Sequence, residues 1–345
     1  MRKIISVATI FAMLLLSTCV SNDRHNPGGY FFFRIIDNGK AVEITGYAGS
    51  GMDVSIPARI LKLPVTKIGK DAFAYLWLRS VVIPDSVTHI GGAAFYRSRL
   101  TEVIIGKGVT HIEYRAFHGN SLTAVAIPEG VTYIGEDAFN YNALTDIVIP
   151  DSVTHIGGWA FNQNKLTSVT IGSGVTHIGN SAFRKNELTS VAIGGGVTHI
   201  GDGAFSGNRL TEIHIPPSVT HIGSRAFAEN RLAGVNIPQG ITQISEMAFM
   251  DNRLTKVVLP EGVTSIGESA FAGNLLTDVT IPDNVTHIGA RAFADNRLTD
   301  IAIPDSVMSI GSRAFQRNLL TGVSVPRGAD VDPDAFDPEV EVTRR

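Results

Sequence analysis

Seven of the ten histidines in this chain stand in one recurring string, Val-Thr-His-Ile. Imidazole binds transition metals and titrates close to neutral pH, so a row of histidines could hold a cation or respond to acid. The strings begin at Val87, Val109, Val153, Val175, Val197, Val219 and Val285. Their spacing decides whether the histidines form a chemical device or belong to a structural repeat.

The intervals between these strings are whole multiples of a period of about 22 residues, and a phenylalanine recurs with the same period. From Phe73 to Phe315 a phenylalanine stands once in each repeat without an insertion, with an isoleucine five positions before it and a leucine five positions after it. The unit reads Leu-Thr-x-Val-x-Ile-Pro-x-x-Val-Thr-x-Ile-Gly-x-x-Ala-Phe-x-x-Asn-x. A fixed period of this length predicts a solenoid, because one unit cannot bury its apolar residues alone.

Each part of the unit predicts a local structure. Val-x-Ile alternates and is β-branched, which favours a short parallel strand with one buried face. The Val and Ile of Val-Thr-x-Ile face the core across a bend, with a very short second strand. Gly-x-x-Ala-Phe predicts one turn of α- or 3₁₀-helix. The recurring asparagine, from Asn120 to Asn318, is expected to bond to backbone groups of neighbouring coils.

This unit resembles the BspA-like, treponemal-type leucine-rich repeat over residues from about 54 to 336. The resemblance implies a right-handed, mainly β leucine-rich-repeat solenoid of about 13 coils, followed by a tail over 337–345. It also implies a bacterial surface protein that binds host matrix or other bacteria without catalysis. Residues 30–53 resemble the family's N-terminal hairpin cap, with a turn at Asp37-Asn38-Gly39.

The start of the chain predicts targeting rather than fold. Arg2 and Lys3 are followed by an apolar run from Ile4 to Leu16, which is short for a membrane span. Cys19 is the single cysteine of the chain, and its position after this run resembles a lipobox. We therefore expect residues 1–19 to be an export signal with lipid on Cys19, and residues 20–29 to be a flexible tether. Without lipidation the chain would be secreted.

The histidine slot of the repeat tolerates other polar residues. Elsewhere it holds Tyr133, Gln243, Ser265 and Ser309, so it is expected to face solvent. A straight row offers a cation two ligands at a time, and the sequence therefore predicts no metal cofactor. The weak metal candidates are the four histidines of successive coils, His155, His177, His199 and His221. Because stacked cations repel, we expect such a row to resist protonation.

Aromatic residues outside the phenylalanine column are concentrated in the early coils. All seven tyrosines and both tryptophans precede residue 160. The candidates for partner binding occupy variable positions of the unit: Tyr75, Trp77, Tyr96, Tyr114, Tyr133, Tyr141 and Trp159. The outward strand positions of the same coils are apolar at Val82, Ile104 and Val148. Exposed Tyr and Trp are typical of binding hot spots. The alternative interpretation is divergence of the early repeats or local packing.

These observations favour a non-catalytic surface protein that contacts extracellular or cell-surface proteins and reaches the membrane through lipid on Cys19. A net charge of −3 gives no basic footprint for nucleic acid. The sequence has no Walker, GxGxxG or HExxH motif, so we expect no enzyme activity, cofactor or small-molecule substrate. Two alternatives remain: a rigid spacer of the cell envelope, and a metal- or pH-responsive module built on the histidines.

Overall fold

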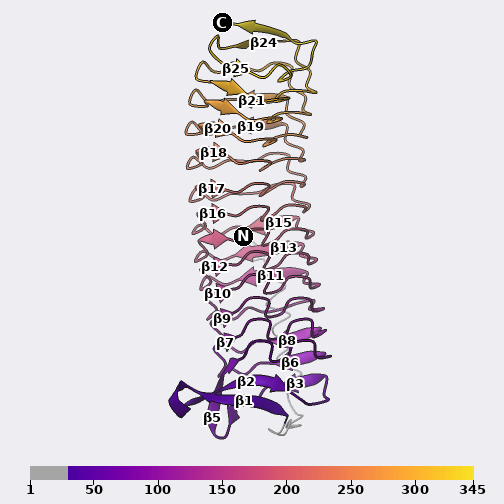
Figure 1. The fold of residues 1–345 in the computed structure, drawn as a ribbon, viewed down its shortest axis with the longest axis vertical. Coiled ribbons are helices and arrows are strands. Elements are labelled where there is room, and N and C mark those ends of the chain that lie inside the picture. Colours follow the sequence, from indigo (N-terminus) through magenta and orange to yellow (C-terminus); the bar gives the residue numbers. More distant parts are fainter. Residues whose placement is uncertain (1–29) are drawn as a thin grey trace, which may run out of the picture.

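The computed structural model describes residues 30–345, which form one long stack of coils (Figure 1). There are about 14 turns of about 22 residues each, so the predicted mainly β repeat solenoid is confirmed. Within residues 30–345 the helical structure amounts to one short 3₁₀ segment, η1 (Asp37–Gly39). The export signal, Cys19 and the tether lie outside the described residues.

The Val-x-Ile segments form parallel strands along one side of the rod, which we call the first strand face. Partners lie one repeat apart; Val81, for example, pairs with Val103. Both valines are buried, whereas the residues after them face outward. The strands of this face are β3 (Asp53–Ser55), β6 (Ser80–Val82), β8 (Glu102–Ile104), β11 (Asp146–Ile149), β13 (Ser168–Ile171), β15 (Ser190–Ala192), β19 (Lys256–Val258), β21 (Asp278–Thr280), β24 (Gly322–Val325) and β26 (Glu341–Arg344).

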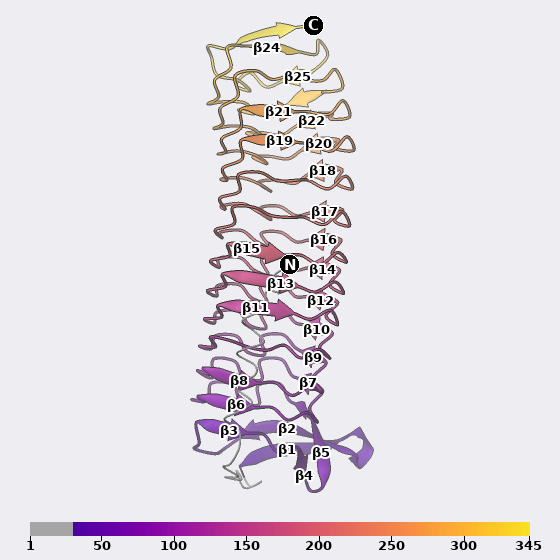
Figure 2. The same ribbon diagram turned by 180° about the vertical axis from the view of Figure 1, so that it is seen from behind.

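The x-Ile pairs form two-residue strands along another side, the second strand face (Figure 2). Each isoleucine is buried, and the residue before it faces solvent at least in part. These strands are β7 (His89–Ile90), β9 (His111–Ile112), β10 (Tyr133–Ile134), β12 (His155–Ile156), β14 (His177–Ile178), β16 (His199–Ile200), β17 (His221–Ile222), β18 (Gln243–Ile244), β20 (Ser265–Ile266), β22 (His287–Ile288), β23 (Ser309–Ile310) and β25 (Asp330–Val331).

The N-terminal end of the rod is a hairpin joined to the second strand face. Strand β1 (Phe31–Ile36) pairs antiparallel with β2 (Ala41–Tyr47), and β2 pairs in parallel with β5 (Leu63–Ile68). Strand β4 (Arg59–Ile60) pairs antiparallel with β5. The rings of β1 and β2 contact Phe73, the first phenylalanine of the repeat. At the other end, residues expected to form a tail contain β26, which pairs in parallel with β24.

The core is a continuous column of phenylalanine rings. Phe205, for example, lies 5.4 Å from Phe183 and 5.6 Å from Phe227 between ring centroids, and the rings are nearly parallel. The repeat isoleucines, leucines and alanines surround this column and are buried along its length. The positions that recur without exception in the sequence are therefore core positions.

The asparagine column joins neighbouring coils, as the sequence predicts. Asn208 Nδ2 donates to the carbonyl oxygens of Phe183 and Phe205 at 3.0 and 2.9 Å, and its Oδ1 accepts from the Leu188 amide at 3.1 Å. The same bonds recur along the rod to Asn318. A buried amide side chain thus satisfies backbone groups that no strand pairs.

The Gly-x-x-Ala-Phe segment forms two successive tight turns instead of a turn of helix. In one coil Ala138 donates to the carbonyl of Gly135 at 3.3 Å, and Asn140 donates to that of Asp137 at 3.1 Å. Asp137 and Tyr141 have φ of 60° and 55°, in the left-handed region. A left-handed residue every four positions stops a helix from continuing. These segments make up a third side of the rod, the turn face.

Candidate functional site

The turn face carries a row of contacting rings in four consecutive coils. The ring centroids of Tyr75 and Tyr96 lie 5.3 Å apart, edge to face. Tyr96 stacks on His118 at 5.1 Å, and His118 contacts Tyr141 at 5.5 Å. Tyr96 and His118 hold equivalent positions in adjacent coils, whereas Tyr75 and Tyr141 each stand at the next position of the unit and reach them from the side. The outer two rings, Tyr75 and Tyr141, are exposed.

Arginines lie against the aromatic residues of the same coils. The guanidinium carbon of Arg99 is 3.8 Å from the ring centroid of Trp77, which is 68% exposed. Arg97 lies 5.3 Å from the Tyr96 ring, and Arg115 lies 4.6 Å from the Tyr114 ring. Such cation–π contacts hold flat side chains in fixed positions. We call this set the aromatic–arginine surface: Tyr75, Trp77, Tyr96, Arg97, Arg99, Tyr114, Arg115 and Tyr141.

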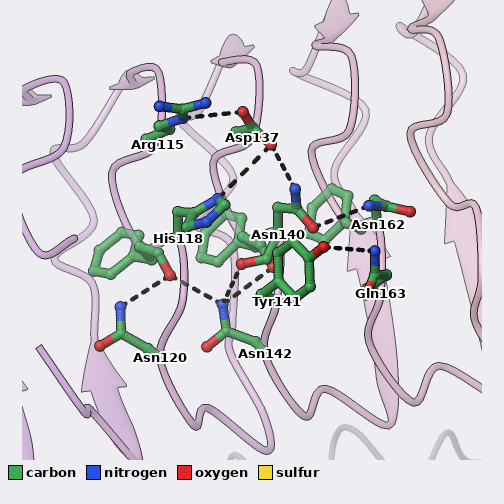
Figure 3. A network of polar contacts seen from close by, with 12 residues as sticks. Arg115, His118, Asn120, Asp137, Asn140, Tyr141, Asn142, Asn162 and Gln163 are labelled. Atoms are coloured by element: carbon green, nitrogen blue, oxygen red, sulfur yellow. Dashed lines mark hydrogen bonds and ion pairs between the residues drawn. The ribbon is translucent and has the colours of Figure 1, made fainter. Parts of the chain in front are cut away.

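A buried carboxylate, Asp137, contacts side chains of this surface (Figure 3). Asp137 accepts from Arg115 Nε at 3.1 Å and from Asn140 Nδ2 at 2.5 Å. Its other close neighbour is His118 Nδ1, at 3.7 Å. Asp137 therefore holds the arginine that packs on Tyr114 and lies beside the histidine that packs between two tyrosines.

The charge of Asp137 is stabilised despite its burial. Burial acts to raise the pKa of this carboxyl group, but His118, Asn140 and Arg115 together hold the pKa below its ordinary value. The carboxylate is thus ionised at neutral pH and can attract the Arg115 guanidinium. Farther along, Asn162 donates to Asn140 Oδ1 at 3.2 Å, and Gln163 donates to the Tyr141 hydroxyl at 2.8 Å.

The remaining candidates from the sequence lie apart from this surface. Val82, Ile104 and Val148 are exposed on the first strand face, and Tyr133 is half-buried on the second. Trp159 is on the turn face, exposed and in a left-handed conformation, in the coil beyond Tyr141. The structure therefore divides the aromatic and apolar candidates among three sides of the rod.

Sequence reasoning missed the polar half of the site. His118, Asp137 and three arginines at 97, 99 and 115 were not candidates, although each stands at a variable position of the unit. His118 carried a signal: it is one of the three histidines outside the Val-Thr-His-Ile strings. Its neighbours in the stack, Tyr96 and Asn140, are also polar or aromatic, which marks a local departure from the repeat.

The histidines of the second strand face form a row of rings with Tyr133. Neighbouring centroids along this row lie between 4.5 Å, for His177 and His199, and 6.2 Å, for His155 and His177. Burial first, and then the adjacent histidines, lower the pKa of His177; burial, His111 and Lys67 do the same for His89. At these two positions the pKa is lowered in the direction expected from stacking, with burial as the larger cause.

Neither a metal cluster nor a membrane-spanning helix is found in the described part of the chain. Among residues 30–345, no three His, Cys, Asp or Glu side chains gather as a metal site would require. In the same range, no helix combines the length and apolar character needed to cross a membrane.

Solved structures with a similar fold include leucine-rich repeat proteins. A leucine-rich repeat protein from Bacteroides ovatus matches with a TM-score of 0.68 at 21% identity, over 94% of this chain and 100% of its own. A leucine rich cell surface protein from Faecalibacterium prausnitzii matches with a TM-score of 0.56 at 27% identity, over 92% of this chain and 87% of its own. The pneumococcal vaccine antigen PcpA matches with a TM-score of 0.50 at 20% identity, over 91% of this chain and 86% of its own. No curated protein matches the chain.

The family match follows the repeat itself. The BspA type leucine rich repeat region is found in 6 copies, over residues 66–189, 132–255 and 242–338. These ranges include the phenylalanine and asparagine columns and the aromatic–arginine surface. The chain belongs to the BspA-type leucine-rich repeat family.

Proposed function

We propose that this protein is a non-catalytic bacterial surface protein that binds extracellular or cell-surface proteins through the aromatic–arginine surface. The observation that carries the proposal is the exposure of Tyr75 and Trp77, at 65% and 68%, beside Arg97 and Arg99. Tyr, Trp and Arg are the residues most enriched in interface hot spots. The similar protein from Faecalibacterium prausnitzii is described as a cell surface protein, which agrees with such a role.

The rigidity of this surface supports binding. Each ring is held by a neighbour in the next coil or by a guanidinium group, and Asp137 fixes two of the underlying side chains. Because these side chains are already ordered, a partner would lose little side-chain entropy when it binds them. The arginines give the surface a positive character that favours a partner with acidic residues.

A comparison of two triple variants tests this proposal. We expect Tyr75→Ala, Trp77→Ala and Arg99→Ala together to reduce retention of host-matrix or bacterial-surface proteins by about tenfold or more. The matched control replaces three exposed apolar residues of later coils, Val258→Ala, Met308→Ala and Leu319→Ala. Pull-down from both sources, with circular dichroism to confirm folding, is the measurement.

Three outcomes would count against this surface as the binding site. Equal retention by the wild type and the surface variant would remove the aromatic–arginine surface from the function. An equal loss in the control variant would show that binding depends on exposed apolar area in general. Retention of nothing by the wild type would favour a rigid spacer of the envelope.

We also propose export and lipid attachment at Cys19, supported by the apolar run from Ile4 to Leu16 and the single cysteine that follows it. Covalent lipid would hold the rod at the membrane with its first coils nearest the surface. We expect the wild-type chain in the membrane fraction and Cys19→Ala outside it. Intact mass spectrometry of the membrane fraction checks this. Unmodified Cys19 in the wild type would exclude the anchor and favour secretion.

A further inference from the structure

The histidines of the second strand face are arranged in pairs rather than evenly. His177 and His199 stack at 4.5 Å with 13° between the ring planes, and His89 and His111 stack at 4.6 Å with 11°. The contacts beyond the first pair are looser. His155 lies 6.2 Å from His177 and is tilted by 39°. The even spacing of the strands therefore does not by itself set the ring positions.

A threonine bond distinguishes the paired histidines from their neighbours. In each of the four, Nδ1 lies 2.8–2.9 Å from the hydroxyl of the preceding threonine. Among the described residues, His155 and His221 have no such contact, and both flank the His177–His199 pair. His287 makes the same bond with no histidine beside it, so within the row from His155 to His221 the threonine bond marks the two histidines that stack.

The same bond bears on which ring nitrogen carries the hydrogen. Thr176 Oγ1 donates its one hydrogen to the Thr154 carbonyl at 3.2 Å, and Thr198 Oγ1 does the same to Thr176 at 3.1 Å. With its single hydrogen in that bond, each hydroxyl accepts from histidine Nδ1–H, and this is the tautomer that we assign to both rings. In the neutral ring, Nε2 is left with a free lone pair.

We propose that His177 and His199 bind a divalent transition-metal cation such as Zn²⁺ through their two Nε2 atoms, with water as the other ligands. Metal-binding histidines typically donate their second ring N–H to an oxygen, and here threonine already accepts it. Zn–N bonds of about 2.0–2.1 Å place two nitrogens about 3.3 Å apart in a tetrahedral site. The ring centroids lie 4.5 Å apart with 13° between the ring planes. Because the Nε2 lone pairs lie in the ring planes, both rings must turn out of the stack until these lone pairs converge on the cation, and the broad His χ2 torsion permits this turn.

The surroundings favour this pair over His89 and His111. Lys67 pairs with His89 in the next strand, and its positive charge opposes a bound cation. The strands beside His177 and His199 carry His155 and His221 instead. We therefore assign the stronger site to His177 and His199.

Zn²⁺ titration of the whole chain by isothermal calorimetry tests the site, with Cys19→Ser in every variant to remove the thiol. We expect His177→Ser and His199→Ser each to weaken binding by about tenfold or more, and Thr176→Val by about tenfold with rescue in Thr176→Ser. Serine fills the same slot at Ser265 and Ser309, so these variants should fold. The matched control is His287→Ser, which removes a histidine with the same threonine bond, 2.7 Å, but with no histidine beside it.

Nitrogen-15 spectra of the histidine rings supply a readout that structural damage would not imitate. We expect Nδ1–H in the free protein and a Zn²⁺-dependent shift of Nε2 at His177 and His199. The proposal is overturned by undiminished Zn²⁺ affinity in the His177→Ser/His199→Ser double variant, or by hydrogen on Nε2 in the free protein. An equal loss in His287→Ser would likewise overturn it, because single surface histidines would then account for the binding.

Discussion

Replacing Phe205 by alanine is expected to lower the free energy of unfolding by about 3–5 kcal/mol, the usual cost of removing a buried aromatic ring. Phe205 is fully buried and stacks on Phe183 and Phe227 in the middle of the rod. Its removal leaves a cavity that rigid coils on both sides cannot fill. In a solenoid each coil is stabilised by its two neighbours alone, so the damage falls on two adjacent interfaces.

The rod should also lose cooperativity at the site of this substitution. Because nearest-neighbour contacts hold the stack together, a weak coil at position 205 allows the halves on either side to unfold separately. Urea denaturation followed by circular dichroism measures the free energy, and limited proteolysis locates the break. Lys185→Ala, an exposed change in the adjacent coil, should alter stability by less than about 0.5 kcal/mol. A single unshifted transition for Phe205→Ala would contradict the nearest-neighbour account.

The predictability of this fold rests on the constant length of its repeat. Phe73 and the eleven phenylalanines that follow, like the isoleucines and asparagines of the same unit, could be placed from the sequence because each must meet its own copy in the next coil. The asparagine bonds could be expected for the same reason. Turn geometry could not, because left-handed residues such as Asp137 and Tyr141 have no common side chain that would reveal their φ.

The candidate site was harder to predict because it joins different columns of the repeat. The periodicity shows that Tyr96 and His118 are neighbours, since they hold the same position in adjacent units. It does not show that His118 meets Asp137, which holds a different position in the unit and so belongs to another column. Nor does it show which histidines stack, since His177 has identical neighbours in sequence on both sides but a stacked ring on one side alone. Side-chain orientation supplied both findings.

Function in such a rod therefore depends on rows rather than on single residues. A side chain repeated in adjacent coils becomes a line of contacts, as the phenylalanine, asparagine and histidine columns show. A row that changes composition locally becomes a distinct surface, as Tyr96, His118 and Asn140 do on the turn face. The same architecture thus supports stability where a row is constant and recognition where it varies.

Asn208→Asp, which replaces one side-chain nitrogen by oxygen, is expected to lower the stability of the folded protein strongly. The Asn208 amide nitrogen lies 3.0 and 2.9 Å from two carbonyl oxygens, and the side chain is buried. An aspartate oxygen in that place would face both carbonyls with a negative charge and no donor nearby. A buried charge without a partner costs about 3–5 kcal/mol. We expect a loss of that size at neutral pH.

The pH dependence of this variant separates charge from packing. Burial against carbonyl oxygens raises the pKa of the new carboxyl group in the folded state above its unfolded value of about 3.9. The folded protein then binds the proton more tightly, so the variant is most stable in acid and loses stability as the pH rises through the folded pKa. Urea denaturation of Asn208→Asp and Asn208→Ala at several pH values measures this difference. Asn208→Ala leaves the Leu188 amide without its acceptor at every pH, at a cost of about 1–3 kcal/mol, and its deficit relative to wild type should stay flat. Parallel pH profiles for the two variants would show that Asn208 matters for its shape and not for the hydrogens that it donates.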